Sequence, residues 1–329
     1  MRNATPSQSP LTRALSLEVA RVTEAAAVAA ARWRGKGDEA AADRAAAEAM
    51  RRELASLPVR GRVVIGEGDR EETPLLFIGE EIGAPDGLAA DIAVDPLEGS
   101  TICAKAQPNA LTVLAIAEGG TLLKAPDIYM DKIAIGPGFA PDLVHLDFAP
   151  AKNLARLAEA KGVPVAALTA CILDRPRHAR LIAEVRAAGA SVQLIGDGDI
   201  AGVIQACEPA ETGIDIYMGL GGAPEGVLAA AALRCIGGRM QGRLSPQNEG
   251  ERRMAADLGV KDIARVYTAE EMASGDVIFA ATGVTDGALL DGVRIGETHV
   301  ETHTLIMRGA TGTIRWVRTK HRKTAKFAV

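Results

Sequence analysis

The chain has 329 residues, 48% of them hydrophobic, which is enough for about two domains with buried cores. A net charge of −5 and an aromatic content of 3% argue against a basic, base-stacking surface for nucleic acid. We read no uninterrupted apolar run of about 18 residues and no signal peptide, so we expect no membrane span and a cytoplasmic location. The four cysteines are scattered without metal-binding spacing, which indicates reduced packing residues.

The first part of the chain predicts two helices against a largely antiparallel sheet. Residues 1–10 are expected to form a disordered arm. Apolar residues at helical spacing predict a helix over residues 10–33, and Asp38 is a suitable N-cap for an alanine-rich helix over residues 39–57. Strands are predicted at residues 63–65, 75–78, 90–94, 110–117, 121–124 and 133–135.

From about residue 151 the pattern alternates between helix and strand, which implies a parallel sheet covered on both faces. The predicted helices are 151–160, 176–188, 199–207 and 224–236, and the strands between them are 167–173, 192–195 and 214–218. A strand at 239–244, a helix at 249–258, a strand at 277–281 and a hairpin of 300–307 with 313–318 complete the chain. We place a domain boundary near residue 160, which gives domains over residues 11–160 and 161–329.

Two acidic loops directly follow predicted strands. The strand at residues 90–94 leads into residues 95–100 (DPLEGS), where Pro96 cannot donate a ladder hydrogen bond. The strand at 63–65 leads in the same way into residues 66–69 (GEGD). Carboxylates beside glycines, which let a ligand approach the backbone, suit a divalent metal and phosphate. A solvated turn after each strand is the alternative.

Residues 196–201 (GDGDIA) match the dinucleotide-binding pattern G-x-G-x-x-A, with Asp215 at a suitable distance downstream. However, Asp197 and Asp199 would face the pyrophosphate, and like charges about 4 Å apart repel by roughly 4 kcal/mol at an effective dielectric constant of about 20. Acids at this loop could instead accept hydrogen bonds from sugar hydroxyls. A dinucleotide-dependent oxidoreductase therefore stays as an alternative.

Further candidate groups follow two other strands. The loop at residues 219–226 (GLGGAPEG) presents Glu225 in the first turn of a helix, and its backbone N–H groups could cradle a phosphate. Arg175 and Arg177 carry planar guanidinium groups that suit phosphate oxygens. If Glu225 converges with the two acidic loops, bound cations must offset the repulsion, and hard oxygen ligands indicate Mg²⁺ or Mn²⁺.

These motifs, taken together and in order, resemble those of the class II fructose-1,6-bisphosphatases. They are VIGEGDR (64–70), DIAVDPLEGS (91–100), APDIYM (125–130), RPRH (175–178), DGD (197–199) and GGAPEG (221–226). The resemblance covers about residues 14–318, and some members also act on sedoheptulose 1,7-bisphosphate. It implies a layered αβαβα sandwich of the sugar-phosphatase and inositol monophosphatase type, with a mixed N-terminal sheet and a doubly wound C-terminal part. The N-terminal domain would then hold metal and phosphate, and the C-terminal domain the substrate.

The resemblance also implies the roles of individual residues. Metal ligands, for Mn²⁺ or Mg²⁺, fall on Asp43, Glu67, Asp95, Glu98 and Glu225. Substrate contacts fall on Gly99, Ser100, Tyr129, Arg175, Pro176, Arg177, Asp197, Gly198, Asp199 and Gly222. Catalytic roles fall on Ser100, Glu71 and Glu98, with Ser100 orienting the water that attacks the phosphate.

The chain departs from the family pattern at three positions. Ser100 stands where threonine is common, Glu39 where a basic residue is frequent, and Glu71 where an aspartate is frequent. The implied activity is hydrolysis of the 1-phosphate of fructose 1,6-bisphosphate in gluconeogenesis and sugar-phosphate metabolism, by a homo-oligomer that is a dimer or tetramer. A dual fructose and sedoheptulose bisphosphatase, a dinucleotide-dependent oxidoreductase and a non-catalytic sugar-phosphate sensor are the alternatives.

Overall fold

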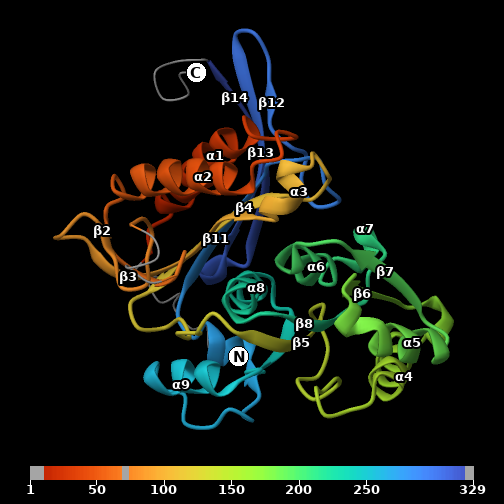
Figure 1. The fold of residues 1–329 in the computed structure, drawn as a ribbon. Helices are drawn as coiled ribbons and strands as arrows, with labels where there is room; N and C mark the ends of the chain where they lie inside the picture. The colour runs from red at the N-terminus through yellow and green to blue at the C-terminus, as the bar shows by residue number, and fades with distance from the viewer. Residues whose placement is uncertain (1–10, 69–73, 323–329) are drawn as a thin grey trace, which may run out of the picture.

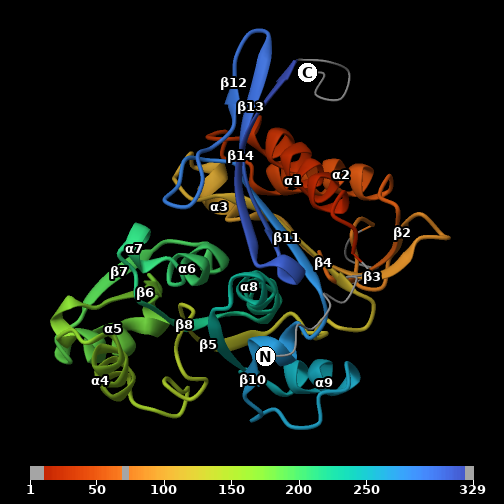
Figure 2. The same cartoon turned by 180° about the vertical axis from the view of Figure 1, so that it is seen from behind.

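The computed structural model describes residues 11–68 and 74–322, and it confirms a mixed α/β fold built on two sheets (Figure 1). The predicted arm at residues 1–10 and the predicted catalytic Glu71 lie outside the described residues. The two sheets lie on opposite sides of α8, with further helices on their outer faces, and views from opposite sides agree on this (Figures 1 and 2). This is the αβαβα layering predicted from the sequence.

The first sheet has eight strands. Seven follow the order β12-β13-β11-β4-β3-β1-β2, and the eighth, β14, also pairs with β13. β1 and β3 are parallel neighbours, so their carboxyl ends meet at one edge of the sheet. The strands are β1 (Val59–Ile65), β2 (Glu81–Gly83), β3 (Leu88–Glu98), β4 (Leu111–Glu118), β11 (Val277–Gly283), β12 (Arg294–Ile295), β13 (His299–Arg308) and β14 (Thr313–Arg322).

The second sheet has six strands in the order β10-β9-β5-β8-β6-β7. It is mixed, because β6 is parallel to β7 and β8, whereas β5 is antiparallel to β8 and β9. The strands are β5 (Tyr129–Ile135), β6 (Thr169–Leu173), β7 (Ser191–Ile195), β8 (Ile216–Gly222), β9 (Arg239–Leu244) and β10 (Tyr267–Thr268). β5 precedes residue 160 and β11 to β14 follow it, so the boundary between the sheets does not coincide with residue 160.

Three hydrophobic clusters join these layers. The first packs α1 (Leu15–Ala31) and α2 (Glu39–Leu54) on the outer face of the first sheet. The second surrounds α8 (Ala223–Ile236) between the sheets, together with α6 (Asp199–Gln205) and α10 (Ala269–Met272). The third packs α4 (Pro150–Lys161) and α5 (Ala179–Ala187) on the outer face of the second sheet.

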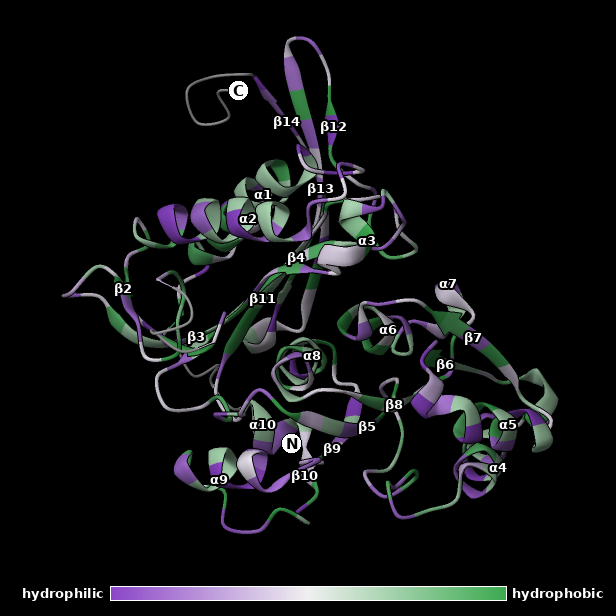
Figure 3. Cartoon of the chain, in the orientation of Figure 1, coloured by the Kyte–Doolittle hydropathy of each residue, from purple (hydrophilic) through white to green (hydrophobic). Residues whose placement is uncertain are grey.

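The helices begin and end where their sequences favour it. The Asp38 side chain caps α2 by accepting a hydrogen bond from the Ala41 N–H at 2.9 Å. α8 has only apolar or small residues over most of its length and is buried on nearly all sides, as its position between two sheets requires. α9 (Glu249–Asp257) is a more hydrophilic surface helix (Figure 3). The short helices are α3 (Ser100–Ala104), α7 (Pro209–Thr212), η1 (Val165–Ala167), η2 (Pro176–His178) and η3 (Gly309–Thr311).

Two predicted strands are wrong. Residues 75–78 form a loop, because Leu76 has a left-handed backbone (φ 54°) and its N–H donates to the Glu80 carboxylate rather than to a ladder. Residues 121–124 contribute a single bridge, between Leu122 and Ala273. The predicted helix over residues 176–188 is also divided, since Pro176 opens the 3-10 turn η2 before α5 begins.

No helix within the described ranges combines the length and the apolarity that a membrane crossing needs.

Candidate active site

Most of the predicted site residues line one cavity of about 270 Å³ between the two sheets. It lies where β3, β6, β7 and β8 end, next to the starts of α3, α6 and α8. A second cavity of about 240 Å³ contains Glu67 and Asp127 and shares Asp95 and Glu225 with the first. The lining of the first cavity includes Asp95, Glu98, Gly99, Ser100, Arg175, Arg177, Asp197, Gly198, Asp199, Gly222 and Glu225.

An irregularity in β3 places its acids at the cavity. Pairing of β3 with β4 is regular up to Asp95, shifts in register across Pro96, and resumes at Glu98. Asp95 Oδ1 accepts a hydrogen bond from Leu97 N–H at 3.1 Å, which holds the turn. Gly99 follows with φ 85°, and a side chain there would also contact Ile102 at 2.7 Å. The chain can therefore turn abruptly from β3 into α3 and present Ser100.

The acids come from four separate elements and repel one another. β1 ends before Glu67 and β3 carries Asp95, so the parallel pairing of these strands brings both carboxylates to one edge. α2 contributes Asp43, whose side chain is hydrogen-bonded to Glu67. Burial, followed by repulsion from Asp43, raises the pKa of Glu67 to about 8. The ionised cluster is therefore costly without positive charge.

Glu98, at the end of β3, and Glu225, in the first turn of α8, complete this cluster. Burial raises the pKa of Glu98, and repulsion from Asp199 adds to the effect. Burial likewise raises the pKa of Asp95 and of Glu225. Glu98 Oε1 accepts from Ile200 N–H at 2.9 Å, which ties β3 to α6.

Two oxygens in the cluster have no internal partner. Glu98 Oε2 and Glu225 Oε2 are buried and make no hydrogen bond within the described part of the chain. A buried carboxylate oxygen without a partner is costly, and such an atom in a cavity indicates a partner from outside the chain. No three His, Cys, Asp or Glu side chains in residues 11–68 and 74–322 are already spaced to enclose an ion. The acids converge but do not close a coordination shell by themselves.

Arg177 lines the same cavity and is oriented by backbone groups. Its Nε and Nη2 donate to the carbonyl oxygen of Leu220 at 3.0 and 2.8 Å, and its guanidinium lies 4.8 Å from the ring centroid of Tyr129. His178 holds the same turn, because its Nδ1 lies 2.8 Å from Leu173 O and its Nε2 accepts from Leu220 N–H at 2.8 Å. The imidazole is thus neutral, and its burial lowers its pKa.

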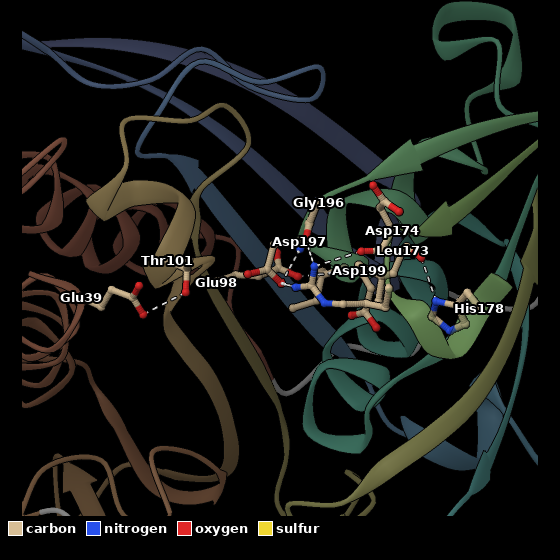
Figure 4. A network of polar contacts seen from close by, with 12 residues as sticks. Glu39, Glu98, Thr101, Leu173, Asp174, His178, Gly196, Asp197 and Asp199 are labelled. Atoms are coloured by element: carbon tan, nitrogen blue, oxygen red, sulfur yellow. Dashed lines mark hydrogen bonds and ion pairs between the residues drawn. The ribbon is translucent and has the colours of Figure 1, made fainter. Parts of the chain in front are cut away.

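Arg175 binds the loop that carries the second pair of acids. Its Nη1 donates to the carbonyl oxygens of Asp174 and Gly196, and its Nη2 lies 3.6 Å from Asp197 Oδ1 (Figure 4). Burial raises the pKa of Asp197, and the charge of Arg175 opposes this shift. Figure 4 shows Asp197 and Asp199 close to Glu98, with His178 farther along the second sheet.

Lys132 is a functional candidate that the sequence analysis missed. It lies in β5, is 1% exposed, forms an ion pair with Asp199 and donates to the carbonyl oxygen of Gly222 at 2.8 Å. The signal was present in the sequence, since a lysine in the apolar strand YMDKIAI cannot reach solvent. Asp127, in the second cavity, was also not assigned.

Some predicted positions lie at the edge of the site or away from it. Tyr129 and Pro176 do not line the 270 Å³ cavity, although Tyr129 packs against Arg177. Glu39 accepts a hydrogen bond from Thr101 Oγ1 at 2.9 Å, so its carboxylate is directed to α3 (Figure 4). Asp215, the acid that a dinucleotide site would require, instead pairs with Lys161 and accepts from Thr169 N–H.

Comparisons with known proteins agree with this geometry. Residues 13–321 match the model of the family described as "Bacterial fructose-1,6-bisphosphatase, glpX-encoded". Two similar proteins from Synechococcus strains JA-3-3Ab and JA-2-3B'a(2-13) are 48% and 47% identical, each over 94% of this chain and 96% of the relative. A protein from Trichodesmium erythraeum is 43% identical over 93% of this chain and 96% of the relative. All three are named D-fructose 1,6-bisphosphatase class 2/sedoheptulose 1,7-bisphosphatase.

Proposed function

The chain belongs to the bacterial, glpX-encoded fructose-1,6-bisphosphatase family, and we propose that it hydrolyses the 1-phosphate of fructose 1,6-bisphosphate in the 270 Å³ cavity. As a member of this family it is a phosphoric monoester hydrolase. The observation that carries the assignment to this cavity is that carboxylates and guanidinium groups line it together. We call Asp95, Glu98 and Glu225 its acidic wall, and Arg175 and Arg177 its basic wall.

The acidic wall, with Asp43 and Glu67 beside it, fits a divalent cation. The fit rests on the two unpartnered oxygens of Glu98 and Glu225 and on an all-carboxylate donor set, which hard cations prefer. We propose Mn²⁺ or Mg²⁺ as that cation, in keeping with the divalent metal requirement that the family implies. When bound, it would neutralise charge developing on the phosphate oxygens and lower the pKa of the attacking water.

The chain's own residues would position the reacting groups around the phosphate. Ser100 presents its hydroxyl at the start of α3, next to Glu98, and would orient the attacking water. Glu98 is held on one oxygen by Ile200 N–H, which leaves the other free to contact the site. Glu71 stays a predicted catalytic acid. The left-handed Gly99 lets the phosphate approach the backbone closely.

The basic wall would hold the phosphate that is not removed. Arg177 donates hydrogen bonds to the Leu220 carbonyl oxygen, and Arg175 donates one to the Gly196 carbonyl oxygen. These bonds fix both guanidinium groups at the cavity before substrate binds. Guanidinium groups suit phosphate, and charge-assisted contacts to it are strong. Asp197, Gly198, Asp199 and Gly222 also line the cavity, and they would contact the sugar hydroxyls.

The alternatives differ in how well they agree with the site. Hydrolysis of sedoheptulose 1,7-bisphosphate as a second activity is favoured by the names of the three relatives. An oxidoreductase is disfavoured because Asp199 is held by Lys132 and Asp215 faces away from the loop. A volume of about 270 Å³ also lies just below the range of small-molecule sites, roughly 300 to 1,000 Å³. A sugar-phosphate sensor, a cytoplasmic location and a dimer or tetramer stay predictions.

Steady-state phosphate release tests the function directly. Purified protein is supplied with fructose 1,6-bisphosphate or sedoheptulose 1,7-bisphosphate, with Mn²⁺ or Mg²⁺ and without a dinucleotide, and the sugar product is identified by NMR. We expect release of one phosphate and formation of fructose 6-phosphate from the first substrate. Binding without turnover would indicate a sensor, and a requirement for NAD would indicate an oxidoreductase. Either result would contradict the proposal.

A further inference from the structure

Lys132 is buried beneath the cavity and contacts two of the residues that line it. Its side chain is fully buried, with 0% of its surface exposed, and its ammonium pairs with the carboxylate of Asp199 at the start of α6. The same ammonium donates to the carbonyl oxygen of Gly222, 2.8 Å away, at the end of β8. Both partners line the 270 Å³ cavity, whereas Lys132 itself does not.

The surrounding residues are adapted to this arrangement. Tyr217 Oη donates to the same oxygen of Asp199 at 3.4 Å. A Cβ at Gly221 would lie 2.9 Å from Lys132 Nζ and would overlap the Asp199 carboxylate, so only glycine fits beside the ion pair. A buried ion pair needs close geometry and further hydrogen bonds to be tolerated, and these contacts supply both. The orientation of the Asp199 carboxylate is therefore fixed before any ligand binds.

A sugar bound in this cavity needs a fixed group that accepts hydrogen bonds from its hydroxyl groups. Arginine side chains donate hydrogen bonds and cannot accept them, so the basic wall cannot receive hydrogen bonds from sugar hydroxyls. The acids of the acidic wall, for their part, are assigned to the cation. Asp199 lines the same cavity, and its charge is balanced by Lys132.

We propose that Lys132 is a positioning residue that holds Asp199 as the acceptor for sugar hydroxyls, and that it thereby gives selectivity for sugar bisphosphates over simple phosphate esters. This inference rests on the proposed function of the cavity. Lys132 does not line the cavity, so it acts through Asp199 and the Gly222 carbonyl, and its charge also lowers the pKa of Glu225.

The chain contains a matched control pair. Lys161, at the end of α4, forms an ion pair with Asp215, which also accepts from Thr169 N–H at 2.8 Å. Asp215 is buried like Asp199, but neither member of this pair lines the 270 Å³ cavity. Lys161→Met therefore removes an ion pair to a buried aspartate without touching the site, although the Lys161 side chain is 25% exposed.

The test compares wild type, Lys132→Met and Lys161→Met on two substrates, fructose 1,6-bisphosphate and p-nitrophenyl phosphate. In Lys132→Met we expect kcat/KM for the bisphosphate to fall roughly ten- to a hundredfold, mainly through KM, as for the loss of one charge-assisted hydrogen bond. The aryl phosphate has no sugar hydroxyls, so its kcat/KM should change less than about threefold. Lys161→Met should lower the melting temperature and leave the ratio of the two kcat/KM values unchanged.

A second variant and a binding measurement separate positioning from folding. Lys132→Met with Asp199→Asn removes the unpaired buried charge, so it should fold well if Lys132→Met alone does not, and it should keep the selectivity loss. Calorimetry of fructose 6-phosphate binding to chelator-treated protein should show the same loss of affinity without turnover. Equal losses on both substrates, or wild-type selectivity in the double variant, would overturn the inference. If wild type failed to hydrolyse the bisphosphate, the proposed function would fail separately.

Discussion

The two walls of the cavity satisfy their charged groups in different ways. On the basic wall, Arg177 is bound by the Leu220 carbonyl and Arg175 by the Gly196 carbonyl. On the acidic wall, Glu98 and Glu225 each keep a buried oxygen that has no partner within residues 11–68 and 74–322. The arginines of the basic wall are thus held by the fold, whereas two oxygens of the acidic wall are not. This difference supports the proposal that the basic wall orients a ligand and the acidic wall binds a cation.

The largest expected effect is the loss of an acid from the acidic wall. Asp95→Asn removes the charge of a proposed metal ligand with little change of shape, so kcat should fall at least about a thousandfold while the fold persists. The control is Asp91→Asn in the same strand, where Asp91 accepts from Thr121 N–H and Leu122 N–H and has no place in the cavity. The control should lower the melting temperature but keep kcat, and comparable losses in both variants would remove the distinction.

Ser100 should give the next largest effect. Because its hydroxyl is expected to orient water, Ser100→Ala should reduce kcat about a hundredfold with a smaller change in KM. Ser100→Thr keeps the hydroxyl and should stay active. Thr101→Val is the matched control, since the neighbouring hydroxyl of Thr101 bonds Glu39 instead of facing the cavity. Mass spectrometry that trapped a phosphoserine at Ser100 would show that the serine is a nucleophile.

On the basic wall the effect should depend on the substrate. Arg177→Ala removes a contact to the phosphate that is retained, so kcat/KM for fructose 1,6-bisphosphate should fall roughly ten- to a hundredfold. Hydrolysis of p-nitrophenyl phosphate should change little. Arg180→Ala is the control, because the exposed Arg180 pairs with Glu184 on the surface of α5. If both substrates suffer equally, Arg177 serves the reacting phosphate or the fold.

The smallest expected effect concerns His178, whose two ring nitrogens hold the turn next to Arg177. Burial lowers its pKa, so the unfolded chain takes up a proton at a higher pH than the folded chain does. Its contribution to stability is therefore full above about pH 6.5 and is lost as the pH falls below that value, by at most about 1.4 kcal/mol per pH unit. Denaturant titrations should show less acid destabilisation in His178→Gln than in wild type, and an unchanged pH dependence would contradict this.

The acidic wall was more predictable from the sequence than the elements around it. Glu67 and Asp95 each follow a short apolar strand, and the predicted helix at residues 224–236 places Glu225 in its first turn, so local pattern located all three. Their convergence followed from the resemblance, and the parallel pairing of β1 with β3 now accounts for it. Asp43 had no local signal, because its neighbours in α2 are alanines on most sides.

Long-range pairing and local backbone geometry could not be predicted in this way. The return of β11 to β14 to the first sheet depends on the pairing of β11 with β4, residues more than a hundred positions apart. The apolar run at residues 75–78 suggested a strand, but the left-handed Leu76 and its bond to Glu80 make a loop. Lys132 was visible as a charge in an apolar strand, yet its partner Asp199 lies on a separate helix.

The most direct test of the account is phosphate release from fructose 1,6-bisphosphate by protein treated with excess EDTA and then given Mn²⁺ or Mg²⁺. Because Lys132 is the one cation whose charge lowers the pKa of Glu225, and Glu98 and Glu225 each keep a buried oxygen without a partner in the described residues, we predict no release after chelation and recovery on addition of either ion. Full activity in excess EDTA would contradict the account, since the acids would then act without the cation that their arrangement requires.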